Sequence, residues 1–249
     1  MYNVAGICYL NTIPFLYGIQ NSAVSSEVKI SLDTPARCAQ KLISGEADIG
    51  LLPVAALPQV EKASIVTNYC IGATGEVKSV LLVANAPLEN IRTIRLDYQS
   101  RTSVLLAQIL AYHHWKLNVN FVFAENDDQL FHLKKQEAAV IIGDRALKYS
   151  SRFLYHYDFA TEWKNFTGLP FVFACWVITR PLPADFLDSF NRALYHGVNH
   201  LEEVAAEQQP LFPGINVLSY LKENISFEFS DDKREGMNLF LKYITHYTD

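Results

Sequence analysis

The chain has 249 residues, a formal net charge of −5 and an apolar fraction of 50%, which is enough for one large domain or for two lobes with a real core. The acidic balance disfavours nucleic acid as a partner, and no apolar run is long enough to span a membrane. The four cysteines stand far apart without a CxxC pair, which argues against a zinc ribbon or a disulfide scaffold. Residues 1–4 show no sign of a secretion signal, so we expect a cytoplasmic protein without a membrane partner.

The first part of the chain alternates between strand and helix patterns. A helix is predicted to begin at Pro35, after Thr34, and to end at Gly45. Short apolar or alternating segments predict strands at residues 2–7, 27–32, 48–52, 65–71 and 79–84, with short helices at 15–19 and 54–60. This alternation is typical of a sheet with helices on its faces.

A second unit of the same kind follows at about residue 90. Strands are predicted at residues 93–96, 120–124, 138–142, 153–157 and 171–179, and helices at 101–115, 127–134, 145–149 and 160–166. Trp176 lies on the last of these strands, and we expect it to pack in the core. From about residue 185 the apolar residues keep helical spacing up to Ala205, and a last helix is predicted around Phe240.

Two such units predict an α/β fold with two lobes and a cleft between them. Lobe 1 is expected to comprise residues 1–87 and 183–249, and lobe 2 residues 88–182, so that the chain crosses between the lobes twice. In such sheets ligands bind beyond the carboxyl ends of the strands. The polar candidates at those ends are Asn11, Ser79, Ser100, Arg101, Thr102, Ser103, Gly143 and Asp144.

The segment 8–14 lies where the first strand ends and a helix begins. Free backbone N–H groups at such a point suit a negatively charged ligand. Asn11 and Thr12 add side-chain donors, and an asparagine does not ionise near neutral pH. The alternative is that one of the two simply caps the following helix.

The segment Ser100-Arg101-Thr102-Ser103 opens a predicted helix directly after a strand. Its three hydroxyls, its backbone N–H groups and the guanidinium could together bind a carboxylate or a phosphate. The alternative is an ordinary serine cap followed by a solvated arginine. We expect Ser79 to face the cleft, while Lys78 points the other way because side chains alternate along a strand.

Metal binding is not predicted. His196 and His200 have i, i+4 spacing on a helix, but they lack the glutamate of an HExxH motif and a third ligand. The sequence also contains no GxSxG, P-loop or dinucleotide fingerprint.

Tyr9-Leu10-Asn11-Thr12 after a first strand resembles the SYLNT motif of chorismate dehydratase, the enzyme that opens the futalosine route to menaquinone. Further blocks that resemble this family follow in the family's order: residues 45–53, 77–80, Asp97 with 100–103, 142–144, and 167–174 with Trp176. The resemblance implies the two-lobed fold of type II periplasmic binding proteins, used as a cytoplasmic enzyme. It implies removal of water from chorismate to give 3-[(1-carboxyvinyl)oxy]benzoate, with neither a metal nor an organic cofactor.

Carried onto this sequence, the resemblance suggests Asn11 as the catalytic residue. The expected substrate-binding residues are Tyr9, Thr12, Ser79, Ser100, Arg101, Thr102, Ser103, Gly143 and Asp144. The expected partner is a small dicarboxylate, chorismate, and a homodimer is compatible with the sequence. Two positions depart from the family pattern, Cys8 where serine is usual and Lys78 where arginine is common.

Our hypothesis places one substrate carboxylate at residues 100–103 and the other end of the substrate at Ser79 and Asn11, so these loops must face each other across the cleft. The proton-abstracting base could be Asp144, Glu76 or a carboxylate of the substrate, and we favour the substrate because no cleft-facing His or Glu is evident. Two alternatives stay open. One is a cytoplasmic protein that binds a small anion without catalysis, and the other is the sister enzyme 1,4-dihydroxy-6-naphthoate synthase.

Overall fold

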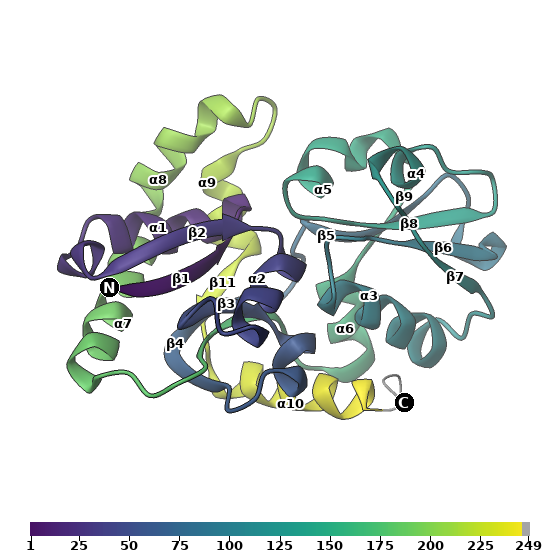
Figure 1. The fold of residues 1–249 in the computed structure, drawn as a ribbon. Coiled ribbons are helices and arrows are strands. Elements are labelled where there is room, and N and C mark those ends of the chain that lie inside the picture. Colours follow the sequence, from purple (N-terminus) through teal and green to yellow (C-terminus); the bar gives the residue numbers. More distant parts are fainter. Residues whose placement is uncertain (246–249) are drawn as a thin grey trace.

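The computed structural model describes residues 1–245, which form two α/β lobes, each built on one sheet (Figure 1). The six-stranded sheet has the order β11-β4-β10-β3-β1-β2 and contains β1 (Tyr2–Ile7), β2 (Val28–Asp33), β3 (Ile49–Pro53), β4 (Ser64–Ala73), β10 (Phe171–Ile178) and β11 (Ser226–Glu228). The five-stranded sheet has the order β7-β6-β8-β5-β9 and contains β5 (Val80–Ala84), β6 (Thr93–Leu96), β7 (Asn120–Phe123), β8 (Glu137–Ile142) and β9 (Tyr155–Asp158). The predicted two-lobed α/β class is confirmed.

Helices cover the faces of both sheets. The α-helices are α1 (Ile13–Gln20), α2 (Pro35–Ile43), α3 (Thr102–Ile109), α4 (Asp127–Phe131), α5 (Gly143–Tyr149), α6 (Phe159–Thr167), α7 (Ala184–Val198), α8 (Leu201–Gln208), α9 (Val217–Ser219) and α10 (Asp231–Ile244). Two π-helical segments, η5 (Leu110–His114) and η8 (Tyr220–Asn224), directly continue α3 and α9. The 3₁₀ segments are η1 (Leu10–Thr12), η2 (Ala23–Ser26), η3 (Val54–Gln59), η4 (Leu88–Asn90), η6 (Ser150–Arg152) and η7 (Gln209–Leu211). None of these described helices is both long and apolar enough to cross a membrane.

Local signals in the sequence set the helix ends. Helix α2 begins with Pro35 after Thr34, and Gly45 follows its end with a φ of +75°, which is the left-handed conformation that glycine accepts readily. Helix α6 begins after Asp158, whose carboxylate accepts from the N–H groups of Ala160 and Thr161. Because this side chain satisfies donors that the first helical turn leaves free, it fixes the start of α6.

The two lobes present equivalent strand ends to each other. Strand β1 pairs in parallel with β2 and β3, and β6 pairs in parallel with β7 and β8. Polar segments follow β1, β6 and β8 directly, and these segments lie between the lobes. This is the arrangement in which open α/β sheets bind ligands.

The predicted domain boundaries need one correction. Strand β5, expected in lobe 1, pairs with β8 and β9 of the five-stranded sheet. Strand β10, expected in lobe 2, pairs with β3 and β4 of the six-stranded sheet. The crossings therefore precede β5 and β10 rather than follow them. The sequence pattern could not show this, because a fully buried apolar strand fits a central position in either sheet.

The chain after β10 mainly packs on the first lobe. Helix α7 packs against α1, and β11 pairs with β4 and so extends the six-stranded sheet. Helix α10 packs against β10 and also against α3 of the other lobe, and it runs below both lobes in Figure 1. The helical pattern of residues 187–205 is divided into α7 and α8 at Asn199 and His200. Residues 246–249, assigned to lobe 1, lie outside the described part.

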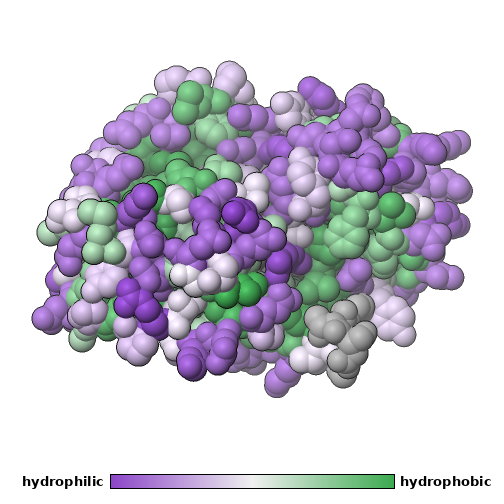
Figure 2. Space-filling view, in the orientation of Figure 1, coloured by the Kyte–Doolittle hydropathy of each residue, from purple (hydrophilic) through white to green (hydrophobic). Residues whose placement is uncertain are grey.

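The core of the first lobe is aromatic. Trp176 is fully buried, and its ring lies 5.8 Å from that of Phe15 and 5.2 Å from that of Phe190. Such edge-to-face aromatic contacts add to the free energy gained from burial alone. Trp176 is therefore a core residue, as expected. Figure 2 shows hydrophilic side chains over most of the face in view, with apolar side chains in smaller areas between them.

Two glycines set the distance between α1 and α7. A Cβ atom at Gly18 would lie 1.9 Å from the carbonyl oxygen of Ala193, and one at Gly197 would lie 1.7 Å from that of Pro14. The two helix backbones are therefore in direct contact, and no side chain larger than hydrogen fits at either position.

We predict that Gly18→Ala destabilises the protein by about 3 kcal/mol, because the added methyl group forces α1 and α7 apart. In a helix without this contact the same substitution would stabilise by about 1 kcal/mol. Gly75→Ala is the matched control, since nothing lies within 4 Å of the position that its methyl group would take. Urea unfolding of both variants measures the difference, and equal stabilities would contradict the proposed close contact.

Candidate functional site

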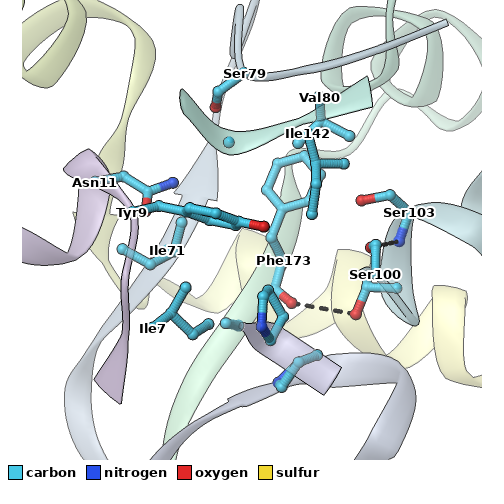
Figure 3. A pocket seen from close by; sticks show the side chains of 15 residues that line it. Ile7, Tyr9, Asn11, Ile71, Ser79, Val80, Ser100, Ser103, Ile142 and Phe173 are labelled. Atoms are coloured by element: carbon cyan, nitrogen blue, oxygen red, sulfur yellow. Dashed lines mark hydrogen bonds between the residues drawn. The ribbon is translucent and has the colours of Figure 1, made fainter. Parts of the chain in front are cut away.

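A hollow with about 500 Å³ of empty space lies between the two lobes (Figure 3). Much of this space is open to solvent or too narrow for a molecule, and the cavity volume itself is about 50 Å³, well below the range of about 300–1,000 Å³ that is usual for small-molecule sites. Its lining comes from both sheets and consists of Ile7, Tyr9, Asn11, Pro35, Pro53, Ile71, Ser79, Val80, Ser100, Thr102, Ser103, Ile142, Gly143, Phe173 and Ala174. The polar members are hydroxyl and amide groups, and the remaining lining is apolar.

Most of the predicted site residues line this hollow. They are Tyr9, Asn11, Ser79, Ser100, Thr102, Ser103 and Gly143. Thr12, Arg101 and Asp144 do not line it. The loops at residues 9–12 and 100–103 thus contribute to one hollow from opposite lobes. The apolar part of the lining was not predicted, although Ile7 and Ile142 are the last residues of two predicted strands and Val80 lies near the start of another.

Asn11 and Ser79 lie on one side of the hollow. Asn11 belongs to η1, the turn that follows β1, and Ser79 directly precedes β5. The Asn11 side chain makes no cap for α1, so the helix-cap alternative does not describe it. Ser79 faces the hollow, whereas the Lys78 side chain is half exposed and lies 3.7 Å from Glu76. The two neighbours therefore point in opposite directions, as expected. Strand alternation is not the reason, because β5 begins only at Val80 and Lys78 has a φ of +59°.

Ser100, Thr102 and Ser103 lie on the opposite side, at the start of α3. The Ser100 hydroxyl oxygen accepts from the N–H of Ser103 at 3.0 Å, which is the geometry of a helix cap. The Thr102 hydroxyl donates to the carbonyl oxygen of Phe173 at 3.3 Å and accepts from the N–H of Ala55 at 3.2 Å. In Figure 3 the Ser103 hydroxyl points toward the hollow. The Ser100 hydroxyl thus caps α3, whereas the neighbouring Ser103 hydroxyl faces the hollow (Figure 3).

Three predicted binding residues point elsewhere. Arg101 donates to the Gln59 side chain at 2.5 Å, so its guanidinium contacts η3 instead of the hollow. The Asp144 carboxylate accepts from the N–H of Leu10 at 3.0 Å. Thr12 is fully buried, and its hydroxyl has no hydrogen-bond partner within the described residues. Spacing alone placed these residues near the site, but their rotamers depend on neighbours far away in the sequence.

Beside the two bonds of Thr102, two more hydrogen bonds join the lobes at the hollow. The Tyr9 hydroxyl donates to the Gln99 side chain at 2.7 Å, and the Leu10 N–H donates to Asp144. Gly143 adopts a φ of +60°, and a Cβ atom there would lie 2.8 Å from the Tyr9 ring. Only glycine therefore allows the ring to lie across the hollow as it does in Figure 3.

Charged groups lie behind the lining rather than in it. Asp97 is fully buried and forms two hydrogen bonds of 2.7 and 2.8 Å with Arg145. The same carboxylate accepts from the N–H of Gln99 at 2.9 Å, which holds the partner of Tyr9 in place. Burial and the nearby Asp97 raise the pKa of Tyr9, so this hydroxyl stays protonated at neutral pH.

No lysine, arginine, histidine, aspartate, glutamate or cysteine belongs to the described lining. A negatively charged ligand would instead meet hydroxyls, backbone N–H groups and the N-terminal ends of α2 and α3, whose first residues Pro35 and Thr102 line the hollow. Within the described residues no group of three or more His, Cys, Asp or Glu side chains is placed to hold a metal ion. His196 and His200 lie in contact with each other and with Tyr17, away from the hollow.

Solved structures with a similar fold include binding proteins. Protein AF1704 from Archaeoglobus fulgidus superposes with a TM-score of 0.80 at 13% identity, covering 99% of this chain and 97% of that one. The Candida albicans CA3427 gene product, described as exhibiting the generic periplasmic binding protein structural fold, gives 0.63 at 13% identity over 98% and 94% of the two chains. The aliphatic sulphonate binding protein SsuA from Escherichia coli gives 0.62 at 12% identity over 99% and 87%. The predicted periplasmic-binding-protein-like fold is confirmed.

Sequence comparison finds a relative with higher sequence identity than these structures and a matching family. The chain is 26% identical over 227 residues to the chorismate dehydratase of Thermus thermophilus, which covers 83% of each protein. A family model described as "Menaquinone biosynthesis" matches residues 2–246. The chain therefore belongs to this menaquinone biosynthesis family, as its motifs predicted.

Proposed function

We propose that this protein is a chorismate dehydratase, which removes water from chorismate to give 3-[(1-carboxyvinyl)oxy]benzoate. The observation that carries the proposal is the buried hollow, where Asn11 and Ser79 lie opposite Ser100 and Ser103 with apolar residues between them. Membership of the menaquinone biosynthesis family and the relationship to the Thermus thermophilus enzyme support it.

The chemical character of the lining suits a flat dianion, which can enter once the lobes have separated. Chorismate carries one carboxylate on its ring and one on its side chain. The hydroxyls at the start of α3 and the free N–H groups there suit one carboxylate, and Asn11 and Ser79 suit the opposite end of the molecule. Ile7, Ile71 and Phe173 offer apolar contacts to the ring between the two ends.

The reaction needs orientation more than a strong base. Loss of the proton at C3 and of the hydroxyl at C4 makes the ring aromatic, so the product is strongly favoured. The protein must then hold one conformer and stabilise the departing hydroxyl. We assign Asn11 to hydrogen bonding at this reacting centre, because its amide lines the hollow and carries no charge that would repel the substrate.

We propose the side-chain carboxylate of the substrate as the base. The two protein candidates lie elsewhere, since Asp144 bonds to Leu10 and the exposed Glu76 pairs with Lys78. Tyr9 is the only ionisable side chain in the described lining, and its raised pKa makes it a donor rather than a base. A base that arrives with the substrate also needs no buried charge in the empty site.

Binding requires the lobes to separate. Asn11, Ser79, Ser100 and Ser103 are all buried, so a ligand reaches them only when the Tyr9–Gln99 and Leu10–Asp144 contacts open. Closure over the substrate would exclude water and bring the two sets of donors together.

We predict that Asn11→Ala lowers kcat for chorismate by at least about 100-fold, because it removes a hydrogen bond at the reacting centre. The measurement follows the new aromatic absorbance and identifies the product by mass. Thr12→Val is the matched comparison, since it replaces a buried hydroxyl without a partner by an isosteric methyl group. An Asn11→Ala enzyme with near wild-type kcat would refute the role, and wild-type protein that binds chorismate without converting it would instead indicate a small-anion receptor.

We predict that Asp144→Asn keeps kcat within about threefold of wild type, because the base comes with the substrate and not from this side chain. The amide oxygen can still accept from Leu10, so the lobe contact survives. A loss of about 100-fold or more would identify Asp144 as the base.

The same variant should change the pH dependence of stability. Burial raises the pKa of Asp144, so its contribution to stability is present below the unfolded pKa of about 4 and is lost as the pH rises through the higher folded pKa. Wild type should therefore lose stability relative to Asp144→Asn between about pH 4 and neutrality. Urea unfolding at several pH values tests this, and a constant difference across that range would contradict it.

A further inference from the structure

The C-terminal part of the chain reaches the site from behind through Tyr220. This residue opens η8, is 3% exposed and does not belong to the lining of the hollow. Its hydroxyl donates to the Ser79 hydroxyl oxygen at 2.9 Å. From the same segment, the Asn224 side chain donates to the carbonyl oxygen of Glu76 at 2.9 Å. One turn of the tail therefore contacts both the Ser79 side chain and the loop before it.

The Tyr220 hydroxyl also lies close to Asn11. Burial raises the pKa of Tyr220, while Ser79 and the nearby Asn11 side chain act to lower it. Of these two contacts, the one with Ser79 has the geometry of a hydrogen bond. Since the phenol stays protonated, its own proton is available to Ser79.

The contact with Ser79 has one direction, because the buried Tyr220 hydroxyl donates to the Ser79 oxygen. We call this hydrogen bond, together with the onward bond from Ser79 to a ligand, the Tyr220 relay. A serine hydroxyl has a single proton. Because the oxygen of Ser79 already accepts from Tyr220, the geometry leaves the Ser79 proton to point away from Tyr220, toward the hollow that this residue lines. Consecutive hydrogen bonds polarise one another, which makes the last donor stronger.

The backbone around Ser79 is fixed independently. The Asp158 carboxylate accepts from the N–H of Val77 at 3.0 Å and from that of Lys78 at 2.7 Å. Lys78 is held at a φ of +59°, and the N–H of Gly143 donates to the Ser79 carbonyl oxygen at 2.8 Å. With the backbone held on both sides, the rotation of the Ser79 hydroxyl is the freedom that remains, and Tyr220 controls it.

We propose that Tyr220 is a positioning residue that directs the proton of Ser79 toward an oxygen of the bound substrate at its reacting end. The identity of this substrate rests on the proposed function. The hydrogen bond from Tyr220 to Ser79 forms within the protein itself. The relay and the proposed function can therefore be tested separately. Tyr220 also gives the C-terminal segment, which carries no recognised motif, a part in the site.

The kinetic test is Tyr220→Phe, which keeps the ring and removes the hydroxyl. We expect kcat for chorismate to fall about tenfold, with KM changed less than about threefold, because the donor loses its orientation while the lining stays in place. Tyr195→Phe is the matched control, since this tyrosine is 59% exposed on α7. A rise in KM at unchanged kcat, or no effect at all, would overturn the proposal.

A double variant separates positioning from a general structural effect. If Tyr220 acts through Ser79, Tyr220→Phe should slow the Ser79→Ala enzyme by less than about threefold, because the hydroxyl that it directs is already gone. Independent, multiplying effects of the two substitutions would show that Tyr220 acts by another route and would reject the relay.

The structural test needs no turnover. In protein labelled with ¹⁵N-serine the backbone amide resonance of Ser79, assigned by its absence in Ser79→Ala, should shift in Tyr220→Phe and stay in place in Tyr195→Phe. Should Tyr220→Phe fail to fold, Ser79→Ala should shift a tyrosine ring resonance in protein with ¹³C-labelled tyrosine, while Ser44→Ala at an exposed position should not. Unchanged resonances would contradict the relay even if chorismate is converted. A clear shift in a protein that leaves chorismate intact would retain the relay and reject the proposed function.

Discussion

The hydrogen-bond donors of the hollow must be held in place by other parts of the protein, because no charged side chain of the described lining is available to attract a ligand. Neutral donors stabilise charge well only when they are already oriented and shielded from water. A hydroxyl that is free to rotate would turn toward a protein acceptor. The contacts around Tyr9, Ser79 and Ser100 follow from this constraint, since each fixes a backbone segment or a side chain that faces the hollow.

The charged side chains that hold these donors in place lie just outside the lining. Asp97 forms a buried ion pair with Arg145 and accepts a hydrogen bond from the backbone N–H of Gln99. The Gln99 side chain in turn accepts from the Tyr9 hydroxyl. Asp158 holds the loop before Ser79 and the start of α6 with one carboxylate. The oxygens of both carboxylates accept hydrogen bonds from N–H groups of the protein. The two carboxylates therefore order the site without presenting negative charge to an anionic ligand.

Local patterns in the sequence were sufficient for most elements up to β10 and for the ends at which the site lies, but they did not show β11. The apolar run before Tyr9 and the Thr34-Pro35 start of α2 are read from a few adjacent residues. The partners of strands β5 and β10 were misassigned because a buried strand carries no mark of its sheet. Tyr220 could not be found at all, since it lies in a helical tail 141 residues from Ser79 and only the folded chain brings them together.

The correction of the lobe boundaries changes how closure should work. Ser79 lies in the crossing between β4 and β5, and Phe173 lies near the start of β10 after the other crossing. When two lobes rotate about such crossings, residues at the crossings move least. Ser79 and the Tyr220 hydroxyl behind it would then stay together whether the site is open or closed. The start of α3 is also tied to the first lobe, since Thr102 bonds to Phe173 and Ala55. The lobes can therefore separate fully only if these two bonds open together with those of Tyr9 and Leu10.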